Sequence, residues 1–187
     1  MSKAKVVAIS GVSGCGKTSI VKQLSKDHAC PYLLFDDFSD DNTYPKDMKQ
    51  WLNHGCDSSE IKTPKFVSAL RQLKIESTHE YIFIEEPFGR CRHSLASLID
   101  YVILLDMPME VCLSRVIMRN INHPNSNSLS SIPRYLSMYD DYLRAVYIES
   151  TNQVRQSCDL IVEEVKSIES TAKPISHWLN DVSKVSK

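Results

Sequence analysis

The segment GVSGCGKTS, residues 11–19, places glycines, a lysine and hydroxyl side chains directly after the apolar run VVAIS. It satisfies the pattern G-x-x-x-x-G-K-[ST], in which backbone N–H groups of a loop and the following helix surround phosphate oxygens. In this pattern Lys17 reaches the β- and γ-phosphates and the Thr18 hydroxyl binds Mg²⁺. The sequence therefore predicts an ATP and Mg²⁺ site. Its expected nucleotide-binding residues are Gly11, Val12, Ser13, Gly14, Cys15, Gly16, Lys17, Thr18 and Ser19.

A second chemical feature is the acidic end of the apolar run YLLFDDF, residues 32–38, which carries Asp36 and Asp37. A carboxylate that faces a phosphate and a metal ion can orient an attacking hydroxyl and accept its proton. Either neighbour, Asp36 or Asp37, meets this requirement. An acidic turn is the alternative interpretation, because aspartate is common in turns.

The run YIFIEEPFG, residues 81–89, also ends in acids, Glu85 and Glu86. A carboxylate at this position beside a phosphate loop can hold the water shell of Mg²⁺, and Glu85 is the expected metal ligand. Glu86 can serve instead. The alternative is a surface ion pair of one glutamate with Arg90 or Arg92.

Two arginines, Arg115 and Arg119, lie four residues apart in a segment with helical apolar spacing. That spacing puts both guanidinium groups on one helix face, where their fixed forks of donors can neutralise phosphoryl oxygens during transfer. We expect both to be catalytic. A solvated helix face is the alternative.

Five apolar runs provide the strands that must position these residues: residues 5–10, 32–38, 81–89, 100–108 and 158–164. Runs without polar alternation are typical of strands buried on both faces of a parallel sheet. Segments with helical spacing lie between these runs, at 17–28, around 48–54 and 64–74, and after Asp106, and a closing helix is expected over 174–182. The pattern predicts a doubly wound α/β fold with five parallel strands and helices on both faces, whose ligands bind beyond the carboxyl ends of the strands.

Bulk composition narrows the function classes. A chain of 187 residues with 42% hydrophobic content predicts one domain spanning 1–187. A net charge of -1 gives no electrostatic case for nucleic acid or an anionic membrane. The initial apolar run is too short for a signal peptide, and no stretch approaches the roughly 20 apolar residues of a membrane span, so we expect a cytoplasmic protein. Six cysteines without a C-x-x-C pair indicate reduced thiols.

The spacing GxxGxGKT, followed by FDDF, EEPFGR and LLDMPMEVCLSRVIMRN, resembles the uridine kinase family, which includes nicotinamide riboside kinases. The resemblance covers most of residues 5–165. It implies a three-layer P-loop NTPase fold with a lid, an aspartate base at Asp36, and an acid at Glu85 near Mg²⁺ or the acceptor's sugar. It also implies lid-base arginines at Arg115 and Arg119. We assign Asp37, Glu86 and Arg90 to the expected substrate site.

The expected lid, residues 120–133, departs from the family pattern. Uridine kinases usually carry further arginines there, whereas this chain reads NINHPNSNSLSSIP, with Arg134 as the next cation. Its Asn, Ser and Pro content is typical of a mobile loop.

These residues predict a small-molecule kinase that transfers the γ-phosphoryl group of ATP to a hydroxyl of a nucleoside-like acceptor. One alternative is a P-loop ATPase or regulatory nucleotide-binding protein without a phosphate acceptor. Another is a kinase of a nucleotide or of a non-nucleoside alcohol. A GTP-specific N-K-x-D run is absent from the sequence. The expected partners are ATP and a small acceptor, and the expected assembly is a monomer or a homodimer.

Overall fold

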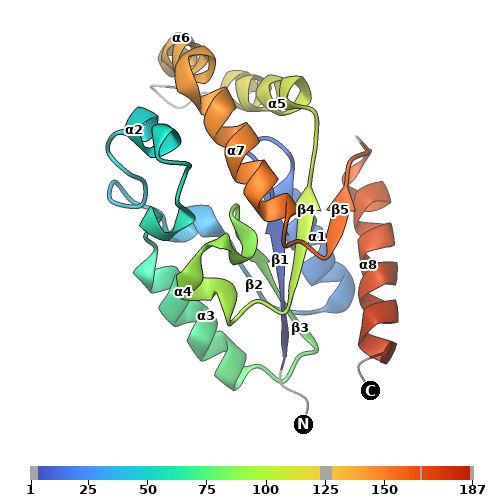
Figure 1. The fold of residues 1–187 in the computed structure, drawn as a ribbon. Helices are drawn as coiled ribbons and strands as arrows, with labels where there is room; N and C mark the ends of the chain where they lie inside the picture. The colour runs from blue at the N-terminus through green and yellow to red at the C-terminus, as the bar shows by residue number, and fades with distance from the viewer. Residues whose placement is uncertain (1–3, 123–127, 165, 186–187) are drawn as a thin grey trace.

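A computed structural model describes residues 4–122, 128–164 and 166–185 of the chain. Its five strands form one parallel sheet in the order β2–β3–β1–β4–β5 (Figure 1). The strands are β1 Lys5–Ser10, β2 Tyr32–Leu33, β3 Tyr81–Glu85, β4 Tyr101–Leu105 and β5 Leu160–Val162. The non-consecutive order places β1 at the centre, so the loop that follows it lies in the middle of the sheet's carboxyl edge.

Helices connect the strands and cover the sheet. The α-helices are α1 Lys17–His28, α2 Met48–Asn53, α3 Pro64–Glu76, α4 His93–Ala96, α5 Met109–Asn122, α6 Ser128–Met138, α7 Arg144–Arg155 and α8 Ile168–Val185. Short 3₁₀ helices are η1 Phe35–Phe38, η2 Ser58–Glu60 and η3 Gly89–Cys91, and a π-helical turn, η4 Tyr139–Leu143, joins α6 to α7. None of the helices described here is both long and apolar enough to cross a membrane.

Alternate residues of β1 pack on opposite faces of the sheet and build two cores. Val7 and Ile9 face α1 and α8, whereas Val6 and Ala8 face α3 and α4. All four side chains have no exposed surface. The helix, sheet, helix arrangement is visible in Figure 1. This three-layer architecture explains the unbroken apolar runs, because a strand covered on both sides has no solvent face to fill with polar residues.

A third cluster of buried residues lies outside the two sheet-facing cores. It brings together residues of η1, α2 and α7, and its members are Phe35, Trp51, Cys56, Ile61, Phe88 and Val146. In Figure 1, α2, α5, α6 and α7 stand together at the end of the molecule opposite the N-terminus. These elements are therefore placed to form walls around the loop after β1.

The sequence predicted the parallel five-stranded sheet with helices on both faces, and the structure confirms it. Two local expectations were wrong. The run 32–38 forms only two residues of strand before FDDF turns into η1. The expected lid loop is helical at both ends, since α5 extends to Asn122 and α6 begins at Ser128; residues 123–127 lie outside the described part of the chain.

Candidate active site

The glycine-rich loop connects β1 to α1 and fits tightly against neighbouring backbone. Gly14 has a φ of 85°, and a Cβ atom there would lie 2.2 Å from the carbonyl oxygen of Cys112 in α5. Gly11, with a φ of 132°, would place a Cβ 2.6 Å from the carbonyl oxygen of Leu105. Both positions exclude side chains because of the left-handed backbone and because of this close approach. The loop is thus held against the ends of β4 and α5.

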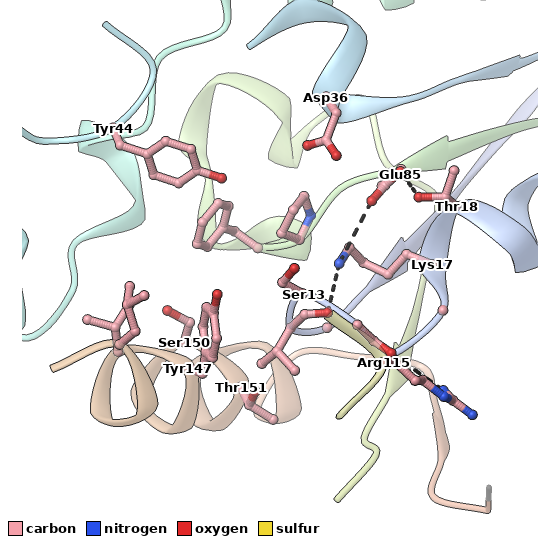
Figure 2. Close-up of a pocket in the computed structure, with 18 of the residues that line it drawn as sticks. Ser13, Lys17, Thr18, Asp36, Tyr44, Glu85, Arg115, Tyr147, Ser150 and Thr151 are labelled. Atoms are coloured by element: carbon pink, nitrogen blue, oxygen red, sulfur yellow. Dashed lines mark hydrogen bonds and ion pairs between the residues drawn. The ribbon is translucent and has the colours of Figure 1, made fainter. Parts of the chain in front are cut away.

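Lys17 turns back over this loop instead of extending into solvent. Its Nζ donates a hydrogen bond to the carbonyl oxygen of Val12 at 2.9 Å and lies 3.8 Å from Glu85 Oε1. The side chains of Lys17 and Glu85 are only 8% and 5% exposed. Figure 2 shows the ammonium group between the loop and the end of β3. A largely desolvated cation at this position attracts an anionic phosphate more strongly than a surface lysine does.

The side-chain oxygens of Thr18 and Glu85 lie together beside the loop. Thr18 Oγ1 donates to Glu85 Oε2 at 2.8 Å (Figure 2). Burial raises the pKa of Glu85, while Lys17 and the Thr18 hydroxyl oppose the rise. Mg²⁺ prefers oxygen ligands and is usually held by one or two protein side chains together with substrate phosphates. This hydroxyl–carboxylate pair beside the phosphate loop fits that requirement.

The two predicted arginines of α5 also reach the site. Arg115 and Arg119 both line the cavity beside the loop. The Nη1 of Arg115 lies 3.4 Å from the carbonyl oxygens of Gly14 and Cys15. Arg119 is close enough to act electrostatically on Glu85, whose pKa it helps to lower against the larger effect of burial. Both arginines are therefore part of the cavity wall next to the loop.

Asp36 approaches the same cavity from η1, on the side opposite α7 (Figure 2). The backbone after Leu34 leaves the sheet and forms a 3₁₀ turn because Phe35 inserts into the third cluster. Phe66 contacts Phe35 and Phe38, with ring centroids 6.4 and 5.4 Å away, and so holds both ends of the turn. The turn exposes its two acids, but only Asp36 lines the cavity.

The cavity that joins these groups has a volume of about 770 Å³. One end contains the phosphate loop, Lys17 and the two arginines. The other end is mainly aromatic and apolar, and is lined by Tyr44, Met48, Trp51, Phe88, Tyr142, Val146, Tyr147 and Ser150. A volume of this size accommodates a small organic molecule in addition to phosphates. Asp36 lies between the two ends (Figure 2).

A second cavity of about 450 Å³ lies next to the first and shares the loop with it. Gly16, Ser19 and Arg115 line both cavities. The second is completed by Met107 after β4 and by residues 166–168, which lead into and begin α8. Phosphates bound on the loop would therefore have space for the remainder of a nucleotide on this side.

The structure separates the predicted site residues into two groups. The first, which lines the main cavity, includes Asp36, Lys17, Thr18, Glu85, Arg115, Arg119, Gly11, Val12, Ser13, Gly14, Gly16 and Ser19. Cys15 lines only the second cavity, and its side chain is buried in the core. Asp37 is exposed and lies outside the cavity lining.

Glu86 and Arg90 were expected in the substrate site, but the structure places them elsewhere. Glu86 is completely buried and accepts a hydrogen bond from Arg92 at 2.9 Å. Burial raises the pKa of Glu86 to about 7, although Arg92 opposes the rise. Arg90 pairs with Asp159 at 2.8 Å and donates to backbone carbonyls near β4 and β5. Neither side chain lines the cavity, because each is fully engaged in joining elements of the fold.

Residues of α7 line the cavity and were missed in the sequence. Tyr147, Ser150 and Thr151 occupy positions i, i+3 and i+4, and therefore share one helix face (Figure 2). Burial raises the pKa of Tyr147, so its hydroxyl stays protonated and can donate a hydrogen bond. The spacing of hydroxyl residues was the available signal. Nothing in the sequence alone showed that this face turns toward the loop after β1.

Comparison with known proteins supports a P-loop kinase. No known protein-family profile matches the chain. The uridine kinase of Borreliella burgdorferi (strain ZS7) is 25% identical over an alignment of 207 residues that covers 97% of each chain. The uridine kinase of Proteus mirabilis is 25% identical over 186 residues, which cover 84% of this chain and 85% of the relative.

Solved structures with the same fold include kinases. The shikimate kinase of Aquifex aeolicus matches with a TM-score of 0.54 at 16% identity, covering 95% of this chain and 98% of that chain. A deoxyadenosine kinase of M. mycoides with bound dCTP matches with a TM-score of 0.55 at 14% identity, covering 94% and 99%. The chain therefore has the fold of P-loop kinases.

Proposed function

We propose that the protein is an ATP-dependent kinase that transfers the γ-phosphoryl group to a hydroxyl of an uncharged, nucleoside-like acceptor. The observation that carries this proposal is the shared cavity. The loop of residues 11–18 lies at one end of it, an aromatic and apolar space lies at the other, and the Asp36 carboxylate lies between them. The similarity to uridine kinases at 25% identity supports the same reaction class.

The phosphate end would hold the triphosphate. Loop N–H groups and Lys17 bind the β- and γ-phosphate oxygens in this proposal, and Arg115 and Arg119 face the phosphoryl group as its charge redistributes. Thr18 and Glu85 would hold Mg²⁺, which supplies further charge neutralisation when bound. The second cavity, next to Gly16 and Arg115, has room for the nucleotide's base and ribose.

At the acceptor end, Asp36 would accept the proton of the attacking hydroxyl. A new bond forms between the hydroxyl oxygen and the γ-phosphorus, and the bond from that phosphorus to the β–γ bridging oxygen breaks, which releases ADP. Asp36 is exposed to the cavity, as a group that must exchange a proton requires. The aromatic walls exclude water, so that the acceptor hydroxyl and not water attacks the phosphorus.

Charge in the cavity favours an acceptor without a carboxylate or phosphate of its own. Among the described residues that line it, the cationic side chains are Lys17, Arg115 and Arg119, all near the phosphate loop. The acceptor end offers aromatic rings and hydroxyls, with Asp36 as its charge. An anionic acceptor would meet this carboxylate without a partner cation, which is energetically unfavourable.

The test is ADP release measured with a panel of acceptors: neutral nucleosides, their monophosphates, and sugar acids. We expect one or more neutral nucleosides to stimulate ADP release at least tenfold over the rate without acceptor. Equal, slow hydrolysis with every compound would instead support a P-loop ATPase without a phosphate acceptor. Stimulation confined to monophosphates or acids would refute the uncharged acceptor.

A further inference from the structure

The most deeply buried ion pair among the described residues lies directly behind the cavity and is not part of its lining. Arg92 and Glu86 are 1% and 0% exposed, and Arg92 Nη1 donates to Glu86 Oε2 at 2.9 Å. Arg92 Nη2 donates to Thr63 Oγ1 at 2.5 Å. The guanidinium carbon also lies 5.5 Å from the centroid of the Phe35 ring. One side chain therefore contacts three separate segments of the fold.

Each of these segments is adjacent, in the chain or by packing, to a residue that neighbours a carboxylate of the cavity. Glu86 directly follows Glu85 at the end of β3, and Phe35 directly precedes Asp36 in η1. Thr63 precedes α3, whose Phe66 packs against the Phe35 ring. The backbone positions of both cavity carboxylates are thus one residue away from groups that Arg92 contacts.

The pair is poorly suited to a purely stabilising role. The Nε atom of Arg92 is buried and has no hydrogen-bond partner among the described residues. Removing two charges from water is energetically costly, and apolar replacements of a buried pair are often as stable as the pair itself. In some proteins, buried polar or ionic groups are retained because they specify one arrangement of their neighbours. Lysine cannot replace Arg92 equivalently, because only the planar guanidinium bonds Glu86 and Thr63 while stacking on Phe35.

We propose that Arg92, paired with Glu86, is a positioning residue that fixes the separation of the neighbouring carboxylates Asp36 and Glu85. This role rests on the proposed function, in which Asp36 accepts the acceptor's proton and Glu85 lies beside the metal and the phosphates. A displacement of about 1 Å between reacting groups can lower a rate by about 10²-fold. Arg92 touches neither the cavity nor the reacting atoms, and acts through Phe35 and Glu86.

The experiment uses the double variant Glu86→Leu/Arg92→Met, which removes both charges and keeps apolar volume, so that the fold is retained. We expect kcat with a neutral acceptor to fall by about 10²-fold, while the Kd for ATP stays within about twofold of the parent value. The matched control is Lys74→Met. Lys74 is a mostly buried cation that pairs with Asp100 at 2.9 Å, near the start of β4, and its loss should leave kcat unchanged.

A second readout does not depend on activity. The charge of Asp36 contributes, after burial, to the raised pKa of Glu85. In the parent, Asp36→Asn should therefore lower the pKa of Glu85, as followed by carboxyl-carbon NMR. In the Glu86→Leu/Arg92→Met background the same substitution should have less than half that effect, because the carboxylates are no longer held together. An equal effect in both backgrounds would overturn the positioning role.

The outcomes separate this proposal from the proposed function. Parent-like kcat in the double variant would show that Arg92 is merely structural, even if the protein is a kinase. If the parent shows no acceptor-dependent turnover, the kinase proposal fails and the NMR comparison alone decides the positioning of the two carboxylates. If the double variant does not fold, Arg92→Lys takes its place. Arg92→Lys keeps the charge, loses the fork, and should lower kcat and the Asp36–Glu85 coupling together.

Discussion

Replacing Lys17 with methionine should change both stability and activity, and the stability change should depend on pH in a defined direction. Lys17 lies 3.8 Å from Glu85 Oε1, and both side chains are more than nine-tenths buried. At this distance, with an effective dielectric constant of about 20, two unit charges attract by about 4 kcal/mol. Lys17→Met also avoids the desolvation of an ammonium group and keeps the stem's packing, so the net loss should be about 1–3 kcal/mol.

The stability loss caused by Lys17→Met depends on pH because Glu85 titrates. Its pKa in the folded protein is raised above the ordinary value, mainly by burial, and loss of Lys17 raises it further. A carboxyl whose pKa is higher in the folded than in the unfolded state binds more protons when folded. The protein therefore becomes less stable as the pH rises from the unfolded-state pKa through the folded-state pKa. The deficit of Lys17→Met relative to the parent should therefore be smallest at acid pH and should grow as the pH rises and the Glu85 carboxyl ionises.

Urea unfolding followed by circular dichroism at several pH values measures this deficit. The double variant Lys17→Met/Glu85→Gln should recover most of it, since no buried carboxylate remains without its cation. Lys74→Met is the matched control, because its partner Asp100 has a lowered pKa and its deficit should stay constant between pH 5 and 8. A Lys17→Met deficit that is independent of pH, or that Glu85→Gln does not relieve, would refute the reasoning. Turnover should fall at least about 10²-fold in both Lys17 variants.

Substitutions at four further positions test separate parts of the site. Asp36→Asn should lower kcat by about 10²- to 10⁴-fold, and ATP binding measured by calorimetry should be nearly unchanged. Asp37 lies outside the cavity lining, so Asp37→Asn should leave kcat within about twofold. The reverse result would make Asp37 the base. Arg119→Ala should lower kcat more than it raises the KM for ATP, and a pure KM effect would assign this arginine to ground-state nucleotide binding. Gly14→Ala places a Cβ 2.2 Å from a backbone oxygen at a φ of 85°. It should therefore lower the free energy of unfolding by about 2 kcal/mol and Tm by about 4–8 °C. An unchanged Tm would contradict the close approach of the loop to α5.

The sequence was most informative where local pattern determines geometry. The loop from Gly11 to Thr18 has fixed spacing and a strand before it, so its position at the sheet's carboxyl edge could be predicted directly. The unbroken apolar runs likewise predicted a sheet covered on both faces, because burial of both strand faces leaves no polar alternation.

Other features depended on tertiary contacts that no local pattern encodes. In the sequence, FDDF follows the apolar run directly and looks like the end of a strand. In the structure, Phe35 packs against Phe66, so that β2 ends early and the two acids lie in η1. Charged residues such as Glu86 and Arg92 are expected at the surface from sequence alone. In the structure both are buried, and they pair with each other. The cavity face of α7, with Tyr147 and Ser150, depends on how that helix crosses the end of the sheet.

The fate of the γ-phosphoryl group tests the central claim most directly. ATP labelled at the γ-phosphorus is incubated with Mg²⁺, the protein and a neutral nucleoside, and the products are separated and identified by mass spectrometry. The account predicts label on a hydroxyl of the nucleoside in amounts equal to the ADP formed, and its near disappearance with Asp36→Asn. Label found only in inorganic phosphate, at the same rate with and without each nucleoside, would contradict it.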